Sequence, residues 1–556
     1  MTLEPPSGAR VAPAALVEGA VVAPRAVAIT ASMMRDMVLC EHRLALDLRG
    51  QPEARDPVGA FTTMLWEDGR EFEAAALGDL AAAAIDLRGL PGPAREVLTA
   101  NAMNGGDRLI LGGRVRHGDL LGDPDLLRRE GTVWWPGDVK SGDAFEDGRP
   151  KRAYAAQVSH YALILARSGL GDGHRAFILD RTGEERAYLL EEPAGPRSTS
   201  PRDAHFALLS RVRAIVGGAS TRPALSAECK GCHWKTACRA NLKAADDLTL
   251  IAELGRAARD ALLPTVSTVS ELAALDPVAI SSPGGLNIRG VGPARLATFV
   301  ERAQLLADPG GAAYARAPLP LAPAPREFFL DVEADPLAGD LIYLHGILER
   351  VRNKGPDVET FHAFFADDPE LGERKAFAEA MALLRSAPAA PIYVYSSYER
   401  TSFRTLQARY PEVCRPEEIE TLFHPSRTID LLAIVRRMTE WPASDRSIKT
   451  LARMCGFEWR DSDPSGANSI EWFRSWRAKG DPAIRERIVR YNNDDVIATR
   501  VVLDALLVLP VRPLAYGHTA SRDPAPAQHG SAKRRAVRLE HTPDRTSTLR
   551  DARSCL

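Results

Sequence analysis

The sequence predicts an α/β protein of several domains. At about 150 residues per domain, its 556 residues suggest three or four. Two stretches, 28–245 and 327–511, alternate between helical and strand-like hydrophobic patterns. A segment rich in Pro, Ala and Gly at 311–326 precedes the second stretch. Hydrophobic residues make up 45% and charged residues 26% of the chain, which excludes a collagenous, wholly disordered or disulfide-scaffold protein.

From these patterns we expect six segments. They are a flexible arm at 1–27, an α/β domain at 28–245, a helical connector at 246–310, a linker at 311–326, a second α/β domain at 327–511 and a disordered tail at 512–556. No run approaches the roughly 18 apolar residues of a membrane span. The first residues also lack the basic region of a signal peptide. We therefore expect a cytoplasmic protein without a membrane partner.

Charge says little about partners, but the type of basic residue is informative. The formal net charge is -2, and a total near zero can hide local patches that bind nucleic acid. Only 10 of the 71 basic residues are Lys. A lysine inside an acidic motif therefore carries more information here than it would in an average chain.

Residues 119–140 combine acidic residues with one such lysine. A Glu130-Gly131 turn signal separates two runs that can pair as a hairpin. Asp125 lies near the first run, and Asp138 and Lys140 lie two apart on the second, so they share a face of the strand. Carboxylates beside an ammonium suit Mg²⁺ or Mn²⁺ with a lysine that acts on a nearby water.

Two helical runs flank this hairpin. The upstream run carries Glu73, and the downstream run carries Gln157 and Tyr161, which are four apart and share a helix face. The order of these pieces resembles the RecB-like branch of the PD-(D/E)xK nucleases. The matching motifs are G-R-E-F-E at 69–73, G-D-P-D at 122–125, D-V-K at 138–140 and Q-V-S-H-Y at 157–161.

The RecB-like resemblance implies a restriction-endonuclease-like domain and a role for each matching residue. Glu73, Asp125 and Asp138 would hold the metal, and Lys140 would act on the attacking water. Gln157 and Tyr161 would support the site and the DNA backbone. Phe72 stands where relatives often have His, which removes one accessory ligand.

A cysteine set follows, with the spacing Cys-x2-Cys-x5-Cys at Cys229, Cys232 and Cys238. Cys40 is the remaining cysteine before the linker and the candidate fourth ligand. Four thiolates suit a [4Fe–4S] cluster or Zn²⁺, and unmetallated thiols are the third alternative. The layout resembles RecB-like nucleases with an iron–sulfur staple, which favours the cluster, whereas His233 could serve a zinc site instead. The staple would join chain ends about 190 residues apart.

The helical connector contains a Gly-Val-Gly turn. Gly290 and Gly292 come just before Pro293, a residue that favours the first turn of a helix. Free backbone N–H groups at such a position bind phosphate. The turn resembles the second half of a helix-hairpin-helix, which contacts DNA without sequence preference. A plain structural connection between helices is the alternative.

The second α/β domain carries a further set of acidic residues. Asp331 and Glu333 share one face of a short apolar strand, and residues 341–349 can pair beside it. A strand leading into a helix at 391–403 carries Glu399. A helix at 490–506 carries Tyr491 and Asp495, four residues apart.

This set resembles the RNase H-like DEDD exonucleases, in particular the YprB-type domain. The matching motifs are D-V-E at 331–333 and Y-N-N-D-D at 491–495. The resemblance implies two metal ions held by the acidic set, with Tyr491 positioning water. Glu399 stands where the wider superfamily has Asp, so its carboxylate reaches one carbon further. We expect Asp430 to belong to a structural strand and Lys449 to a helix start.

Together the resemblances imply a metal-dependent nuclease that cuts DNA at one site and trims strands from the 3′ end at another. RNA is the alternative substrate. A separate helicase is a further possible partner, since no P-loop motif occurs in this chain. The competing hypothesis is a non-catalytic nucleic-acid-binding protein in which one or both nuclease sites are degenerate.

Overall fold

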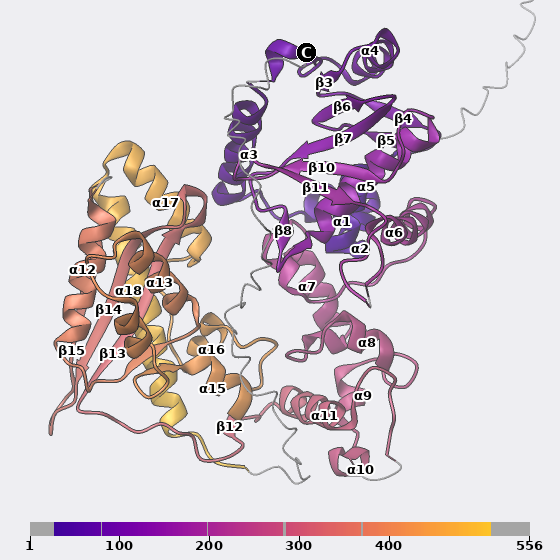
Figure 1. Cartoon of the computed structure of the whole chain (residues 1–556). Helices are drawn as coiled ribbons and strands as arrows, with labels where there is room; N and C mark the ends of the chain where they lie inside the picture. The colour runs from indigo at the N-terminus through magenta and orange to yellow at the C-terminus, as the bar shows by residue number, and fades with distance from the viewer. Residues whose placement is uncertain (1–26, 79, 197, 282–284, 369–370, 513–556) are drawn as a thin grey trace, which may run out of the picture.

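The structure, a computed structural model, describes residues 27–78, 80–196, 198–281, 285–368 and 371–512. The arm expected at 1–27 and the tail expected at 512–556 lie outside these residues, apart from Val27 and Arg512. Two α/β lobes are joined by a run of helices (Figure 1). None of the described helices is both long and apolar enough to cross a membrane.

The N-terminal lobe is built on a six-stranded mixed sheet with the order β11-β10-β7-β6-β3-β2. Its strands are β2 (Ile85–Asp86), β3 (Leu109–Leu111), β6 (Leu126–Glu130), β7 (Val133–Val139), β10 (Arg175–Leu179) and β11 (Glu185–Leu189). Two smaller sheets accompany it. One contains β1 (Ile29–Thr30), β5 (Leu120–Gly122) and β4 (Val115–His117), and the other contains β8 (Phe145–Glu146) and β9 (Arg149–Pro150).

The predicted hairpin of this lobe is confirmed. β6 and β7 are antiparallel neighbours, with Glu130 opposite Val133 at the turn. Gly131 supplies a positive φ of 61°, which a residue with a side chain adopts at a cost. β7 pairs in parallel with β10 on its other side, so it is a central strand and Asp138 at its end lies inside the lobe.

Helices cover both faces of this sheet. They are α1 (Ala31–Leu39), α2 (Glu41–Arg49), α3 (Ala60–Gly78), α4 (Gly92–Gly105), α5 (Arg152–Arg167) and α6 (Pro201–Val216). Leu77 of α3 packs against Val139 and Phe177 on one face. Val158 of α5 packs in a cluster with Ile178 on the other face. Alternate residues of the strands thus supply the two cores, and α3 and α5 lie on opposite sides of the sheet.

The connector is helical and leads into a short extra sheet. Helix α7 (Lys235–Ala244) precedes it at the end of the first expected domain, and the helices of the connector are α8 (Arg256–Leu262), α9 (Val269–Ala273), α10 (Pro277–Ser281) and α11 (Pro293–Ala307). The expected linker at 311–326 is not a free tether. Part of it forms β12 (Tyr314–Ala315), which is buried and pairs with β18 (Thr439–Glu440) of the C-terminal lobe. Apolar Tyr314 and Ala315 explain this docking, which the Pro-rich composition obscures.

The C-terminal lobe has a five-stranded sheet with the order β15-β14-β13-β16-β17. Its strands are β13 (Arg326–Asp335), β14 (Leu341–Val351), β15 (Val358–Phe365), β16 (Ile392–Val394) and β17 (Thr428–Asp430). β13, β14 and β15 form an antiparallel meander, as predicted for the first two. β16 and β17 continue the sheet in parallel with β13.

Helices also sandwich this second sheet. They are α12 (Gly372–Arg385), α13 (Tyr398–Arg409), α14 (Pro416–Leu422), α15 (Leu431–Met438), α16 (Ile448–Met454), α17 (Gly466–Lys479) and α18 (Pro482–Leu507). Phe328 and Leu330 of β13 pack toward α12, α13 and α14. Phe329 packs with the core that contains α15 to α18. A central strand buried on both faces explains the apolar run before Asp331, whose side chain shares the α18 face with Phe329.

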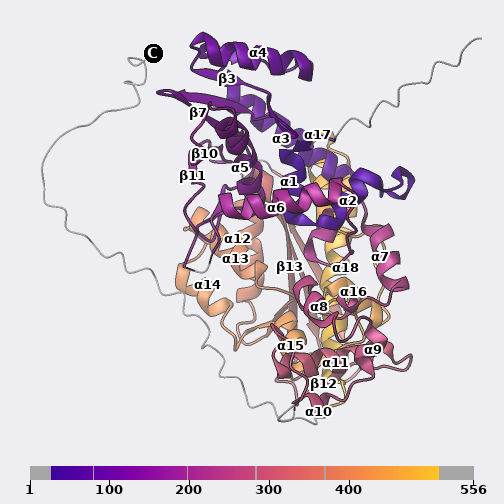
Figure 2. The same ribbon diagram turned by 90° about the vertical axis from the view of Figure 1, so that its right-hand side faces the viewer.

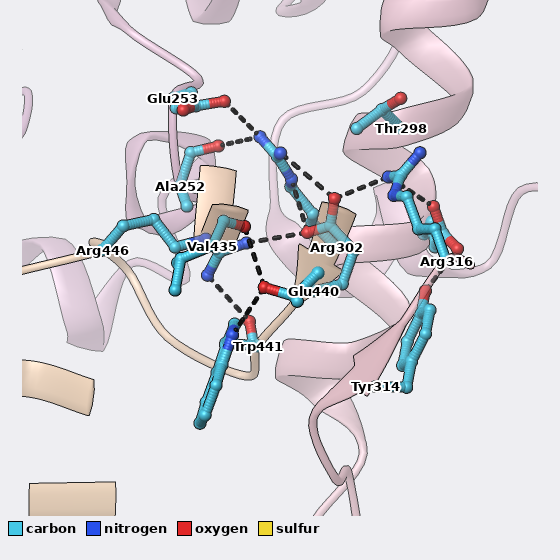
Figure 3. Close-up of polar contacts among 12 residues, drawn as sticks. Ala252, Glu253, Thr298, Arg302, Tyr314, Arg316, Val435, Glu440, Trp441 and Arg446 are labelled. Carbon is cyan, nitrogen blue, oxygen red and sulfur yellow. Dashed lines mark hydrogen bonds and ion pairs between the residues drawn. The ribbon is translucent and has the colours of Figure 1, made fainter. Parts of the chain in front are cut away.

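Buried charges join the connector to the C-terminal lobe (Figure 3). The carboxylate of Glu440 is 1% exposed and accepts from three guanidinium groups. Arg302 of α11 donates at 2.9 and 3.2 Å, Arg316 after β12 at 2.5 Å, and Arg446 at 2.7 Å. These arginines outweigh burial and lower the pKa of Glu440. Glu440 therefore stays ionised and fixes connector, linker and lobe together.

The two lobes also touch directly. α17 packs against α3 of the N-terminal lobe, and the two helices lie beside each other in the turned view (Figure 2). Arg474 of α17 forms an ion pair with Asp68 of α3 across this contact. The C-terminal lobe is therefore joined to the connector at the Glu440 cluster and to the N-terminal lobe at the α3–α17 contact.

Candidate metal centres

Three carboxylates meet beside β13, the central strand of the C-terminal sheet. Asp331 and Glu333 project from one face of β13, and Asp495 projects from α18, which packs on that face. One ligand oxygen of each lies within 4.8 Å of the others. Glu333 is buried, whereas Asp331 and Asp495 are partly exposed. The expected gathering of these residues is therefore present in the fold, with one side open to solvent.

The electrostatics of this group favour a cation. Burial raises the pKa of Asp331 well above its ordinary value, and the nearby charges of Glu333 and Asp495 raise it further. Burial, with the charge of Asp495 added, raises the pKa of Glu333 to about 8. Hard carboxylate oxygens crowded at this distance repel one another unless a proton or a divalent cation lies between them. The residues thus fit Mg²⁺ or Mn²⁺.

The fourth predicted ligand, Glu399, lies apart from this trio. It is the second residue of α13 and is 4% exposed. Its carboxylate accepts from Ser396 Oγ at 3.1 Å. Burial raises its pKa to about 7. Its charge is felt at Asp331, but its oxygens are outside the group that meets within 4.8 Å.

The sequence interpretation assigned no role at the site to three residues around the trio. Asn492 Nδ2 donates to Asp331 Oδ2 at 2.6 Å, and Trp459 Nε1 donates to Asp495 Oδ1 at 2.7 Å. Lys449 lies in the first turn of α16, as expected. Its Nζ, however, lies 3.0 Å from Tyr491 Oη and 4.0 Å from Asp495 Oδ1. The scarcity of lysine was a usable signal for Lys449. Asn492 lies inside the Y-N-N-D-D motif, and no local pattern marks Trp459.

The N-terminal lobe brings together a second acidic set. Asp125, just before β6, accepts from the backbone N–H of Val139 at 2.8 Å. Lys140 Nζ donates to Asp138 Oδ2, so these two share a face as predicted. The charge of Asp138 acts on both Asp125 and Glu73 of α3. Asp125, Asp138 and Lys140 are therefore neighbours at the end of β7, and Glu73 of α3 is near enough to feel the charge of Asp138. Among the described residues, these three carboxylates do not meet within 4.8 Å as the C-terminal trio does.

Their pKa shifts follow from burial and crowding. Burial, then Asp138, raises the pKa of Asp125 well above its ordinary value, although Lys140 opposes this. The same two causes raise the pKa of Glu73. Burial works against the Lys140 ammonium, yet Asp138 and Asp125 outweigh it and raise the lysine pKa. Lys140 is therefore a cation held by carboxylates.

Gln157 and Tyr161 of α5 lie beneath this set. Gln157 Nε2 donates to Tyr161 Oη at 3.1 Å, and Tyr161 Oη donates to the carbonyl oxygen of Asp123 at 3.2 Å. Tyr161 is 2% exposed and Gln157 is 8% exposed. With these bonds, Gln157 and Tyr161 can support the segment that carries Asp125. The expected contact of these two side chains with the DNA backbone stays a prediction.

The four predicted cysteines line one pocket. Cys40 lies between α1 and α2, and Cys229, Cys232 and Cys238 come from the segment around the start of α7. Burial, then the neighbouring thiols, raises the pKa of Cys238 to about 12. Arg256 Nη2 donates to Cys40 Sγ at 3.2 Å. The fold thus places the thiol of Cys40 in the same pocket as three thiols that lie about 190 residues later in the chain.

His233, the alternative zinc ligand, has another partner. Its Nε2 lies 2.6 Å from Asp47 Oδ1, and the same oxygen accepts from Trp234 Nε1 at 2.9 Å. His233 is not among the residues that line the cysteine pocket. His233 is therefore not placed as a ligand, whereas a different histidine, His42, lines the pocket together with the four thiols.

The Gly-Val-Gly turn has the predicted backbone. Gly290 has a φ of +87°, and Gly292 is the N-cap of α11, with Pro293 in its first turn. Both glycines are exposed. The N-terminus of α11 is therefore accessible at the surface of the connector.

Comparison with protein families assigns a fold to the C-terminal lobe. Residues 328–507 match a family model described as the RNase_H superfamily, a stretch that runs from β13 to the end of α18. This lobe is thus an RNase H-like domain, a nuclease-type fold whose members use divalent metal ions. The match does not extend to the N-terminal lobe or the connector, where the RecB-like resemblance stays a prediction. No curated protein matches the chain.

Proposed function

We propose that the protein is a metal-dependent nuclease that hydrolyses DNA or RNA phosphodiester bonds at two separate centres. The observation that carries this proposal is the meeting of Asp331, Glu333 and Asp495 within 4.8 Å in an RNase H-like lobe. By resemblance to the DEDD exonucleases, this centre removes nucleotides in the 3′ to 5′ direction. The N-terminal centre is the RecB-like one.

The C-terminal centre would bind Mg²⁺ or Mn²⁺ through Asp331, Glu333 and Asp495, with Glu399 as an additional carboxylate. Divalent ions in such a site stabilise charge on the attacking and leaving oxygens of the phosphodiester. Asn492 and Trp459 hold one oxygen each of Asp331 and Asp495 and so orient these ligands. Tyr491 presents a hydroxyl beside them that can position a water.

The N-terminal centre would use Glu73, Asp125 and Asp138 as ligands for the same ions. Lys140 is held against Asp138, where it can orient the water that attacks the phosphorus atom. Gln157 and Tyr161 fix the segment leading to Asp125. Removing Lys140 should slow cleavage while leaving the carboxylates in place.

We propose that the cysteine pocket holds a [4Fe–4S] cluster in preference to Zn²⁺. Tetrahedral Zn²⁺ with bonds of about 2.3 Å needs sulfur atoms about 3.8 Å apart. Among the described residues, the carboxylate trio is the one group of three or more candidate ligands that meets within 4.8 Å, so the four thiols are more widely spaced. A cluster spans a wider set of thiolates than a single ion does. Its role would be structural, tying Cys40 to the start of α7.

The remaining parts of the proposal concern the substrate path. Gly290 and Gly292 at the N-terminus of α11 would contact a phosphate of the nucleic-acid backbone, as in a helix-hairpin-helix. A separate helicase would supply unwound strands. A cytoplasmic location, where thiols stay reduced, completes the proposal.

A nuclease assay tests the function. End-labelled single- and double-stranded DNA and RNA are incubated with the full-length protein and Mg²⁺, Mn²⁺ or EDTA. We expect cleavage that requires a divalent ion and that is reduced by Asp331→Ala or Asp138→Ala. Binding of the same oligonucleotides without cleavage under every condition would instead support the non-catalytic nucleic-acid-binding protein.

A further inference from the structure

The amine of Lys449 occupies an unexpected position beside the C-terminal centre. Lys449 Nζ lies 3.0 Å from Tyr491 Oη and 4.0 Å from Asp495 Oδ1. The ammonium also lies over two aromatic rings, 5.2 Å from the centroid of Tyr491 and 5.7 Å from that of Trp459. Cation–π contacts of this kind hold a lysine in place even where it is reachable by solvent.

The contact with Tyr491 fixes the direction of a hydrogen bond. An ammonium group can only donate, so the Tyr491 oxygen accepts from Lys449. The single hydroxyl proton of Tyr491 must then be donated elsewhere. Asp495 is its other hydrogen-bond partner. Lys449, Tyr491 and Asp495 therefore form a directed chain that ends at a predicted metal ligand.

Trp459 strengthens this arrangement from the other side. Its indole N–H donates to Asp495 Oδ1, while its ring packs between Lys449 and Arg453, which lie four residues apart on α16. Trp459 is 7% exposed, whereas the Lys449 side chain is 29% exposed. The lysine is thus the most solvent-exposed member of the group.

We propose that Lys449 is a positioning residue of the C-terminal centre that acts through Tyr491. It orients the Tyr491 hydroxyl and places a fixed positive charge beside the scissile phosphate. The proposal rests on the nuclease function proposed above. A lysine with a purely structural role would only balance the negative charge of the carboxylates. Its loss would lower the stability of the fold without a specific loss of kcat.

The test compares Lys449→Met, Lys449→Arg, Tyr491→Phe and the Lys449→Met/Tyr491→Phe double variant. Each is made in the full chain with the N-terminal centre disabled by Asp138→Ala. The probe is a 5′-labelled single-stranded DNA oligonucleotide with Mn²⁺. We expect Lys449→Met to lower kcat about 10- to 100-fold, as loss of one charge-assisted hydrogen bond would, with a smaller change in KM. Lys449→Arg should recover part of this loss.

The double variant tests whether the lysine acts through Tyr491. Residues that act as a unit show non-additive losses, so the double variant should be no slower than the slower single variant. Multiplied losses, or a Lys449→Met enzyme with wild-type kcat, would overturn the role of Lys449. Lys375→Met is the matched control, because Lys375 on α12 is 75% exposed and paired only with Glu379 across one helical turn.

A second readout does not depend on turnover. Removing a cation 4.0 Å from Asp495 should leave Mn²⁺ binding to Lys449→Met equal or tighter, as measured by calorimetric titration. Weaker Mn²⁺ binding would show that the lysine maintains the fold of the site and would overturn the inference. A parent Asp138→Ala protein that binds Mn²⁺ but never cleaves would overturn the function proposed for the C-terminal centre, and this inference with it.

Discussion

Arg474 of α17 donates to both carboxylate oxygens of Asp335, at 2.6 and 3.0 Å. Asp335 lies in β13, two residues after Glu333. The same guanidinium forms an ion pair with Asp68 in α3, five residues before Glu73. One side chain therefore connects the strand of the C-terminal centre to the helix that carries part of the N-terminal centre. Asp335 is 1% exposed and depends on this arginine for its charge partner.

Replacing Arg474 with Met should destabilise the protein. A buried carboxylate that loses its charged hydrogen-bond partner costs about 1–3 kcal/mol, which corresponds to a fall in Tm of roughly 3–10 °C for the C-terminal domain. Scanning calorimetry measures this change. Arg474→Lys should recover part of the loss, since Lys keeps the charge but not the forked geometry.

Asp68→Ala is the matched control for this prediction. It removes the ion pair between α3 and α17 but leaves both bonds from Arg474 to Asp335. The Tm of the C-terminal lobe should therefore fall much less than in Arg474→Met. An Arg474→Met protein that melts like the wild type would contradict the importance of the Asp335 pair.

The sequence predicts the parts of the site that depend on local geometry. Asp331 and Glu333 share a face because strands repeat every two residues, and Gln157 contacts Tyr161 because helices repeat about every four. These relations hold whatever the rest of the chain does. The gathering of the four cysteines in one pocket was also predictable, because three of them have the close spacing typical of metal-binding thiols.

Contacts set by tertiary packing could not be predicted. Lys449 reaches Tyr491 only because α16 packs against α18, and Trp459 reaches Asp495 from a segment with no motif. Arg474 and Asp68 are 406 residues apart in the chain. β12 looked like linker because two apolar residues among many prolines carry no periodic signal.

The stability of the metal-free protein should fall as pH rises from about 5 to about 8. In the fold, the pKa of Glu333 is raised to about 8 and that of Glu399 to about 7, from 4.5. Both groups therefore hold protons in the folded state that the unfolded chain has lost, and this stabilisation disappears as pH passes the raised values. Each such group contributes up to about 1.4 kcal/mol per pH unit.

Bound metal should reverse this dependence. Mg²⁺ or Mn²⁺ replaces the protons, so the rise in Tm on adding metal should be larger at pH 8 than at pH 6. Thermal melts in EDTA and in saturating Mg²⁺ across this range provide the measurement. Glu333→Gln should weaken both the pH dependence and the response to metal. A flat metal-free profile with no effect of Mg²⁺ would argue against a cation site at the trio.

Cys40→Ser should lower bound iron and thermal stability together. Cys40 is the ligand contributed by the start of the domain, so losing it opens the link to the start of α7 as well as the cluster. Iron analysis and visible absorbance report the cluster, and the Tm reports the link. Cys455→Ser is the control, because Cys455 ends α16 in the other lobe. Stoichiometric zinc without iron in the wild type would remove the iron–sulfur proposal.

We expect the two proposed centres to act independently and to yield different products. Asp138 and Asp331 lie in different lobes, each with its own lysine and its own carboxylates. Independent sites at a distance should give additive losses. We expect Asp138→Ala and Asp331→Ala each to remove a different class of product. Only the double variant should be inert on every substrate. Product ladders from 5′- and 3′-labelled strands distinguish the classes.

Lys140→Ala separates metal binding from chemistry at the N-terminal centre. In an Asp331→Ala background it should slow cleavage about 10²- to 10⁴-fold, the contribution of one acid–base group, while Asp125→Ala should impair metal binding as well.

Identical ladders from Asp138→Ala and Asp331→Ala would defeat the two-centre proposal. If the position of Glu399 outside the carboxylate trio makes the C-terminal centre inactive, Asp331→Ala will change nothing and Asp138→Ala alone will abolish cleavage. That outcome would leave the RNase H-like lobe as a domain that only binds the strand.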